Sequence, residues 1–252
     1  MMIIFDIDGV IRDVGQSYRR ALADTVEHYT NNNYRPTNND IDDLKSEGIW
    51  NNDWEASQEL IYRYSEGQGG DRLSLDLDYP ALVDFFQSRY RGQNWDGYIT
   101  TEPLLVTPDY FDSLTAAGIA WGFFSGATRG SAEYVLKHRL GLNDPILFAM
   151  EDGPGKPDPT GLFQVMEILN PGSNTPVFYA GDTVGDMQTV NLARQEREER
   201  PFLAIGILPP HIQHDPTRQT QYSDKLIASG AACVLPRITD LTPAYCESLL
   251  GV

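Results

Sequence analysis

The sequence predicts an α/β protein built on a doubly wound parallel sheet, with an all-helical segment inserted near its start. Short apolar runs of strand length recur along the chain, and helix-period stretches separate the later runs. From Ser17 to about Arg91 the pattern is nearly all helical. We therefore expect a Rossmann-like core formed by residues 1–14 and 104–252, and an inserted helical domain formed by residues 15–103.

Six apolar runs are expected to form the buried strands, because strands of a sheet covered on both faces are apolar throughout. They are Met2–Phe5, 119–124, 146–150, 177–180, 202–208 and 231–235. Helices are expected around 111–117, 132–140, 162–169 and 187–193, where apolar residues recur every three or four positions. Residues 209–222 are expected to form a long loop.

The inserted segment begins with a continuous helix face. Apolar or small residues fall at helical spacing between Tyr18 and Tyr29. Pro80 stands where the first turn of a later helix is expected. The stretch around Trp54 has two interpretations: Asp53 caps a helix whose core includes Trp54, or Asn52 and Trp54 contact the organic part of a substrate.

Composition limits the possible partners. The chain has 252 residues, is 41% hydrophobic, and carries a net charge of −17. Such a charge repels nucleic acid and anionic membranes, and the sequence contains no basic patch to offset it. With no long apolar run and no signal-like start, we expect a cytoplasmic protein that binds neither nucleic acid nor membrane. The sequence leaves the oligomeric state open.

Polar side chains follow four of the predicted strands. Because parallel strands end at one edge of the sheet, the loops there converge on a common crevice. The residues delivered to it are Asp6, Asp8, Ser125, Gly126, Lys156, Asp182 and Asp186. Arg12 and Arg129 lie close by in the sequence and are expected either to meet a substrate anion or to form salt bridges.

Four carboxylates close together cannot all stay ionised unaided, so either one of them takes up a proton or a cation binds. Mg²⁺ prefers oxygen ligands and is commonly shared between protein carboxylates and a substrate phosphate. A lysine, a hydroxyl and the amides of a glycine loop suit phosphate oxygens. The cluster therefore predicts a metal-assisted phosphate site, for which Mg²⁺ is a fitting ion.

Each residue type suits one role in phosphoryl transfer. Asp6 is expected to attack phosphorus and to bind Mg²⁺, and Asp8 to act as general acid and then general base. Lys156 is expected to hold Asp6 and offset charge in the transition state. Ser125 and Gly126 are expected to bind phosphate, Asp182 to bind the metal, and Asp186 to bind the metal or to anchor its neighbours.

Four segments, DIDGVIRD, FFSGATRG, GKPDP and GDTVGD, resemble in order the four motifs of the haloacid dehalogenase superfamily. The resemblance implies a Rossmannoid core with a helical C1-type cap, Mg²⁺, and an aspartyl-phosphate on Asp6. It also implies metal binding by Asp182, Asp186 and the backbone carbonyl of Asp8. True dehalogenases of this family lack an acid two residues after the nucleophile, so Asp8 favours a phosphatase.

We therefore expect a Mg²⁺-dependent phosphatase acting on a small phosphorylated metabolite. A phosphomutase with the same aspartyl-phosphate chemistry is the closest alternative, because the four motifs do not separate the two. A non-catalytic protein that binds a phosphorylated ligand on the same scaffold is a further alternative. The sequence does not identify the substrate.

Overall fold

The computed structural model describes residues 1–50, 52–170 and 174–251. The chain divides into two compact units. The first, formed by Met1–Asp13 and Pro103–Val252, is called the sheet unit, and the second, Val14–Glu102, the helical unit. Among the described residues, no helix combines the length and apolar character needed to cross a membrane.

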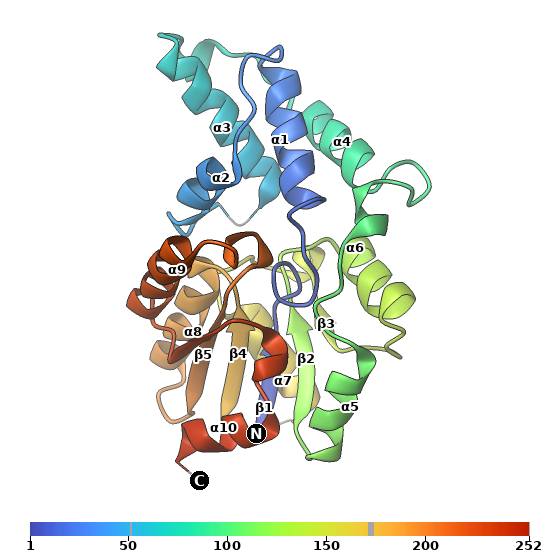
Figure 1. The fold of residues 1–252 in the computed structure, drawn as a ribbon, viewed down its shortest axis with the longest axis vertical. Coiled ribbons are helices and arrows are strands. Elements are labelled where there is room, and N and C mark those ends of the chain that lie inside the picture. Colours follow the sequence, from blue (N-terminus) through green and yellow to red (C-terminus); the bar gives the residue numbers. More distant parts are fainter. Residues whose placement is uncertain (51, 171–173, 252) are drawn as a thin grey trace. The chain divides into compact units, whose positions relative to one another are not determined.

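The sheet unit contains six parallel strands in the order β3-β2-β1-β4-β5-β6 (Figure 1). Their bounds are β1 Met2–Phe5, β2 Ala120–Phe124, β3 Leu147–Phe148, β4 Val177–Gly181, β5 Phe202–Ile207 and β6 Cys233–Leu235. This confirms the predicted α/β fold with a doubly wound parallel sheet. The third strand is shorter than the expected 146–150, because a 3₁₀ turn begins at Met150.

The centre of the sheet is β1, where Phe5 pairs with Phe123 of β2 on one side and with Ala180 of β4 on the other. The chain runs outward from β1 to β2 and β3, then crosses to β4 on the opposite side of β1. β1 and β4 are neighbours, but the chain continues from them toward opposite edges of the sheet, so the loops that follow them lead apart. Where two such loops separate, a crevice forms at the carboxyl edge of the sheet.

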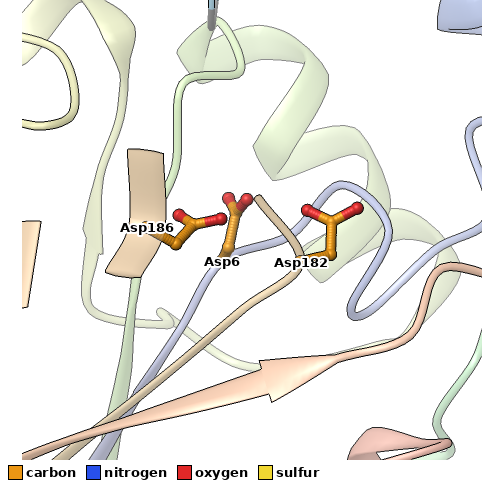
Figure 2. Close-up of side chains that lie close together, drawn as sticks. All are labelled: Asp6, Asp182 and Asp186. Atoms are coloured by element: carbon orange, nitrogen blue, oxygen red, sulfur yellow. The ribbon is translucent and has the colours of Figure 1, made fainter. Parts of the chain in front are cut away.

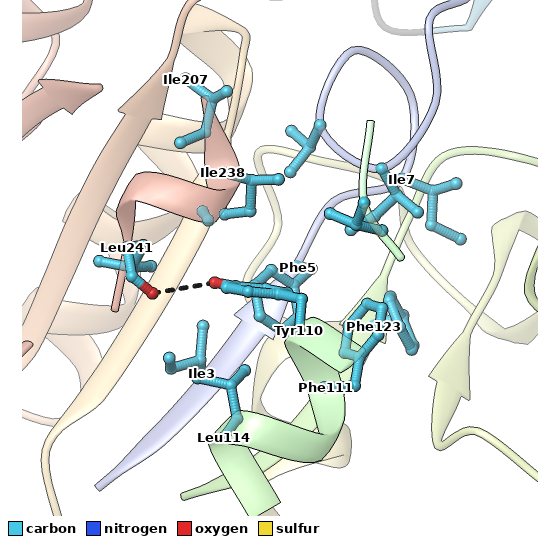
Figure 3. Packing of buried hydrophobic residues seen from close by; sticks show 14 of the residues in the cluster. Ile3, Phe5, Ile7, Tyr110, Phe111, Leu114, Phe123, Ile207, Ile238 and Leu241 are labelled. Atoms are coloured by element: carbon cyan, nitrogen blue, oxygen red, sulfur yellow. Dashed lines mark hydrogen bonds between the residues drawn. The ribbon is translucent and has the colours of Figure 1, made fainter. Parts of the chain in front are cut away.

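Both faces of the sheet are covered by helices, as its apolar strands require. Ile3 and Phe5 of β1 belong to one buried apolar cluster, and Met2 and Ile4 belong to the other. In the first cluster the Tyr110 hydroxyl donates a hydrogen bond to the Leu241 carbonyl oxygen, 3.0 Å away (Figure 3). Every buried residue of the two clusters lies in the sheet unit.

The helices of the sheet unit follow the strands in alternation. They are α5 Pro108–Ala116, α6 Arg129–Glu133, α7 Thr160–Leu169, α8 Val184–Glu196, α9 Pro216–Ala228 and α10 Pro243–Leu250. Helix α6 continues as a wider π-type turn, Tyr134–Arg139.

The expectation of a long loop over 209–222 is wrong. Asp215 accepts hydrogen bonds from Thr217 and Arg218 amides, and this cap starts α9 at Pro216.

The helical unit contains α1 Tyr18–Tyr29, α2 Asn38–Lys45, α3 Asp53–Gly67 and α4 Tyr79–Tyr90. No strand occurs among its described residues. Pro80 lies in the first turn of α4, as predicted. The expected cap at Asp53 is wrong by one position: Asn52 is the N-cap of α3, and its side-chain oxygen accepts a hydrogen bond from the Trp54 amide.

Candidate active site

Three buried aspartates meet at the carboxyl edge of the sheet, and each is placed by a different backbone feature (Figure 2). Asp6 directly follows β1, and its amide donates to the Ala180 carbonyl oxygen of β4 at 2.8 Å. Asp182 directly follows β4, and Asp186 lies in the first turn of α8. One carboxylate oxygen from each aspartate lies within 4.8 Å of the other two.

The turn after β1 allows Asp182 to approach. Gly9 has φ of +75°, and a Cβ placed on it would lie 1.9 Å from Oδ2 of Asp182. A side chain at this position would therefore collide with the carboxylate, and the left-handed backbone conformation disfavours other residues as well. From the opposite direction, the Tyr222 hydroxyl of α9 donates to the Asp182 carbonyl oxygen at 2.9 Å.

Lys156 is a basic side chain in direct contact with two of these acids. Its Nζ lies 2.9 Å from Oδ1 of Asp6 and 2.6 Å from Oδ1 of Asp186. The rings of Phe124 and Tyr179 each have their centre 5.5 Å from Nζ. Burial alone lowers the pKa of Lys156, but the negative charges of Asp186 and Asp6 outweigh it and raise that pKa, so the ammonium stays charged.

Asp186 is occupied by hydrogen-bond donors on both oxygens. Oδ1 accepts from the Tyr179 hydroxyl at 3.1 Å as well as from Lys156. Oδ2 accepts from the Thr183 amide at 2.9 Å and from its hydroxyl at 2.7 Å, which forms the capping box of α8. Burial raises the pKa of Asp186, but Lys156 and Thr183 overcome it and hold that pKa below its ordinary value.

Asp6 differs from Asp186 in its electrostatics. Burial is the largest cause that raises the pKa of Asp6 to about 7, and the negative charges of Asp186 and Asp8 add to it, while Lys156 opposes it. Three buried carboxylates thus meet here, and Lys156 contacts two of them, Asp6 and Asp186. A divalent cation with oxygen ligands fits this donor set.

Asp8 lies on the rim of the cluster. Its carboxylate is 25% exposed, and Oδ1 lies 2.6 Å from the Arg12 guanidinium, which is fully buried. Of the two interpretations for Arg12 in the sequence, the structure shows the salt bridge. Arg129 likewise forms ion pairs, with Asp152 and with Glu133.

Ser125 and Gly126 follow β2, the neighbour of β1. Ser125 is buried, its amide donates to the Phe148 carbonyl oxygen at 3.0 Å, and its Oγ accepts from the Ala127 amide at 3.2 Å. No atom comes within 4 Å of a Cβ built on Gly126, so this stretch of backbone has open space beside it. The structure thus places both residues at the carboxyl edge that also carries Asp6.

The remaining predicted residues, Asn52 and Trp54, lie in the helical unit at the start of α3. Asn52 serves as a helix cap, and Trp54 is partly exposed. Their contact with a substrate stays a prediction.

Sequence reasoning missed two residues that shape the site. Thr183 and Asp186 form a T-x-x-D pattern, close to a capping box, and this signal was available in the sequence. Tyr179 sits inside an apolar strand, where nothing in the pattern distinguishes it from a packing residue.

Comparison with known proteins agrees with the fold and with the motifs. The family model of haloacid dehalogenase-like hydrolases matches residues 1–193. A protein of Phytophthora nicotianae named imidazoleglycerol-phosphate dehydratase is 30% identical over 190 residues, which covers 73% of this chain but only 40% of that protein.

Solved structures share the fold at low sequence identity. A phosphonoacetaldehyde hydrolase-like protein from Oleispira antarctica has a TM-score of 0.71 at 17% identity, covering 98% of this chain and 91% of that one. A phosphatase from Thermococcus thioreducens has a TM-score of 0.64 at 21% identity, covering 82% and 93%. The match of the family model over more than half of the chain carries the assignment: this protein belongs to the haloacid dehalogenase-like hydrolases.

Proposed function

We propose that this hydrolase is a Mg²⁺-dependent phosphatase that cleaves a small phosphorylated metabolite through an aspartyl-phosphate on Asp6. The observation that carries the proposal is the contact of Asp6 with Lys156 at 2.9 Å inside a cluster of three buried carboxylates. A nucleophilic carboxylate beside a fixed cation suits attack on a phosphate dianion.

In the first step, an oxygen of Asp6 attacks phosphorus as the ester P–O bond breaks, and Asp8 gives its proton to the leaving oxygen. In the second, Asp8 takes a proton from water, whose oxygen attacks phosphorus and releases inorganic phosphate from Asp6. Lys156 holds Asp6 and offsets negative charge in both steps, while Ser125 and the amide of Gly126 bind the phosphate oxygens.

The residues that would hold Mg²⁺ are Asp6, Asp182 and the backbone carbonyl of Asp8. Bound there, the ion supplies positive charge against the phosphate oxygens. Asp186 was predicted as a metal ligand or as an anchor; the four donors at its two oxygens favour the anchor, with Lys156 as the group that it holds.

One relative suggests a compound class for the substrate test. The protein of Phytophthora nicotianae is named for imidazoleglycerol phosphate, which is a phosphate monoester carrying an imidazole ring. Imidazole-bearing phosphate monoesters therefore belong in the substrate panel beside sugar phosphates and other phosphorylated metabolites. Asn52 and Trp54 of the helical unit are proposed to contact the organic part of the substrate.

The test is phosphate release from this panel by the wild type, with Mg²⁺ and with a chelator, beside Asp6→Asn. The exposed Asp112→Asn on α5 serves as the matched control. We expect release that requires Mg²⁺, survives in Asp112→Asn and disappears in Asp6→Asn.

Other results identify the alternatives. Conversion of a substrate to its positional isomer, stimulated by a bisphosphate and without net phosphate release, would establish the phosphomutase. Binding of phosphorylated ligands with neither reaction would leave a non-catalytic binding protein.

A further inference from the structure

Arg12 is a fully buried arginine whose backbone is fixed from two directions. Its amide donates to the Ile7 carbonyl oxygen at 3.2 Å, and its own carbonyl oxygen accepts from the Gly9 amide at 2.9 Å. Arg12 also bridges Leu104 in antiparallel fashion, and the flanking Asp13 amide donates to the Pro103 carbonyl oxygen at 2.8 Å. The guanidinium therefore starts from a Cα that has little freedom to move.

The guanidinium of Arg12 contacts the Asp8 carboxylate. Its Nε and Nη2 each lie 2.6 Å from Oδ1 of Asp8. An exposed ion pair contributes little because both partners are mobile and hydrated. Here the Arg12 side chain is 0% exposed and the Asp8 side chain is 25% exposed. The buried guanidinium is therefore the more rigid partner, and it holds the orientation of the Asp8 carboxylate.

We propose that Arg12 is a positioning residue that holds the Asp8 carboxylate in the orientation used for proton transfer. This inference rests on the proposed function, in which Asp8 is the general acid and base. A proton donor must lie within hydrogen-bond reach of the leaving oxygen, and a displaced carboxylate loses that reach. Asp6, Lys156 and Ser125 are held by other contacts, so attack on phosphorus and phosphate binding continue without Arg12.

Leaving-group chemistry separates this role from a purely structural one. The oxygen of p-nitrophenyl phosphate departs readily without a proton, whereas the oxygen of an alkyl phosphate needs one. Loss of proton transfer to the leaving oxygen therefore slows the first step far more for alkyl esters than for nitrophenyl esters. This step is reported by kcat/KM, whereas the second step is the same for every ester. A general disturbance of the fold slows both kinds of ester by the same factor.

The experiment measures kcat and KM with Mg²⁺ for p-nitrophenyl, phenyl and alkyl phosphates in the wild type, Arg12→Gln and Arg12→Lys. For Arg12→Gln we expect kcat/KM on the alkyl ester to fall by about tenfold or more beyond the fall on p-nitrophenyl phosphate, since positioned acid–base groups contribute about 10² to 10⁴. Arg12→Lys, which keeps the charge, should recover part of the loss.

Two further variants sharpen the result. In an Asp8→Asn background, Arg12→Gln should cause no additional loss, because the group that it positions is gone. Arg200→Gln controls for removing a buried arginine. Arg200 donates to the Thr175 carbonyl oxygen just before β4, at the amino edge of the sheet, so its replacement should affect all esters equally or not at all.

Several outcomes would overturn the proposal. An equal loss of kcat/KM for all three esters, no loss, or an effect that adds to that of Asp8→Asn would each show that Arg12 does not act through Asp8. If Arg12→Lys fails to fold by circular dichroism while Arg200→Gln folds, Arg12 is structural. Wild-type protein that releases phosphate from none of the esters would overturn the proposed function together with this inference.

Discussion

Two features require glycine at position 9: its left-handed backbone conformation and the close approach of the Asp182 carboxylate. We predict that Gly9→Ala lowers the free energy of unfolding and also weakens Mg²⁺ binding by displacing the Asp182 carboxylate. Gly118→Ala is the matched control, because Gly118 has a similar φ of +71° but no atom within 4 Å of a Cβ built on it. In both variants the positive φ should lower the free energy of unfolding by about 1–2 kcal/mol, because alanine disfavours this backbone conformation.

Only Gly9→Ala should bind Mg²⁺ more weakly in calorimetry. Equal Mg²⁺ affinity in Gly9→Ala and Gly118→Ala would contradict a role for Asp182 at the metal.

The raised pKa of Asp6 predicts a pH dependence in the metal-free protein. Folding raises this pKa from 3.8 to about 7, so the folded state holds the proton more tightly, and this stabilisation is present below pH 3.8 and lost as the pH rises through 7. Mg²⁺ competes with the same proton, so its affinity should be about tenfold higher at pH 8 than at pH 6.

The measurement is the rise in melting temperature caused by Mg²⁺ at these two pH values. The rise should be larger at pH 8, and in Asp6→Asn it should be small at both. Equal shifts in the wild type at pH 6 and pH 8 would refute the assignment of Asp6 to the metal.

At the scale of the element, the first turn of α8 connects helix formation to the site. Thr183 caps the helix and also donates to Asp186, which in turn holds Lys156. We predict that Thr183→Ala lowers the free energy of unfolding by about 0.5–2 kcal/mol, as loss of a helix cap does, and also lowers kcat.

Thr242→Ala is its control, because Thr242 caps α10, which carries none of the acids of the site, by accepting a hydrogen bond from the Tyr245 amide. It should cost similar stability in urea unfolding and leave kcat unchanged. A Thr183→Ala enzyme with wild-type kcat would show that the cap of α8 does not position Lys156.

At the scale of the whole molecule, the two apolar clusters of the sheet unit are complete without residues of the helical unit. The Asp13 amide and the Pro103 carbonyl oxygen are 2.8 Å apart, so a short linker can join the two segments of the sheet unit. We predict that a chain with residues 14–102 replaced by such a linker folds and binds Mg²⁺.

This shortened chain should still hydrolyse p-nitrophenyl phosphate, but lose about tenfold or more of the wild-type preference for its best metabolite, if the helical unit selects the substrate. Circular dichroism, calorimetry and steady-state kinetics would test the three expectations. An unchanged preference would place substrate selection in the sheet unit.

The sequence predicted strands well where burial on both faces makes the whole run apolar, as in β1, β4 and β5. It failed where a local polar contact decides the boundary. Asn52 instead of Asp53 caps α3, and Asp215 starts a helix inside an expected loop. A polar residue near a helix start can cap it or lie within it, and only backbone geometry distinguishes the two.

The sequence by itself determined the order of strands and helices and the acids, hydroxyl and lysine at the strand ends, because apolar periodicity and residue chemistry are local properties. Tertiary structure alone decided which of these groups touch. The pairing of Lys156 with both Asp6 and Asp186, and of Arg12 with Asp8, depends on how strands and turns come together. The pKa of Asp6 also depends on tertiary structure, because burial and the charges of neighbouring side chains from other segments set it.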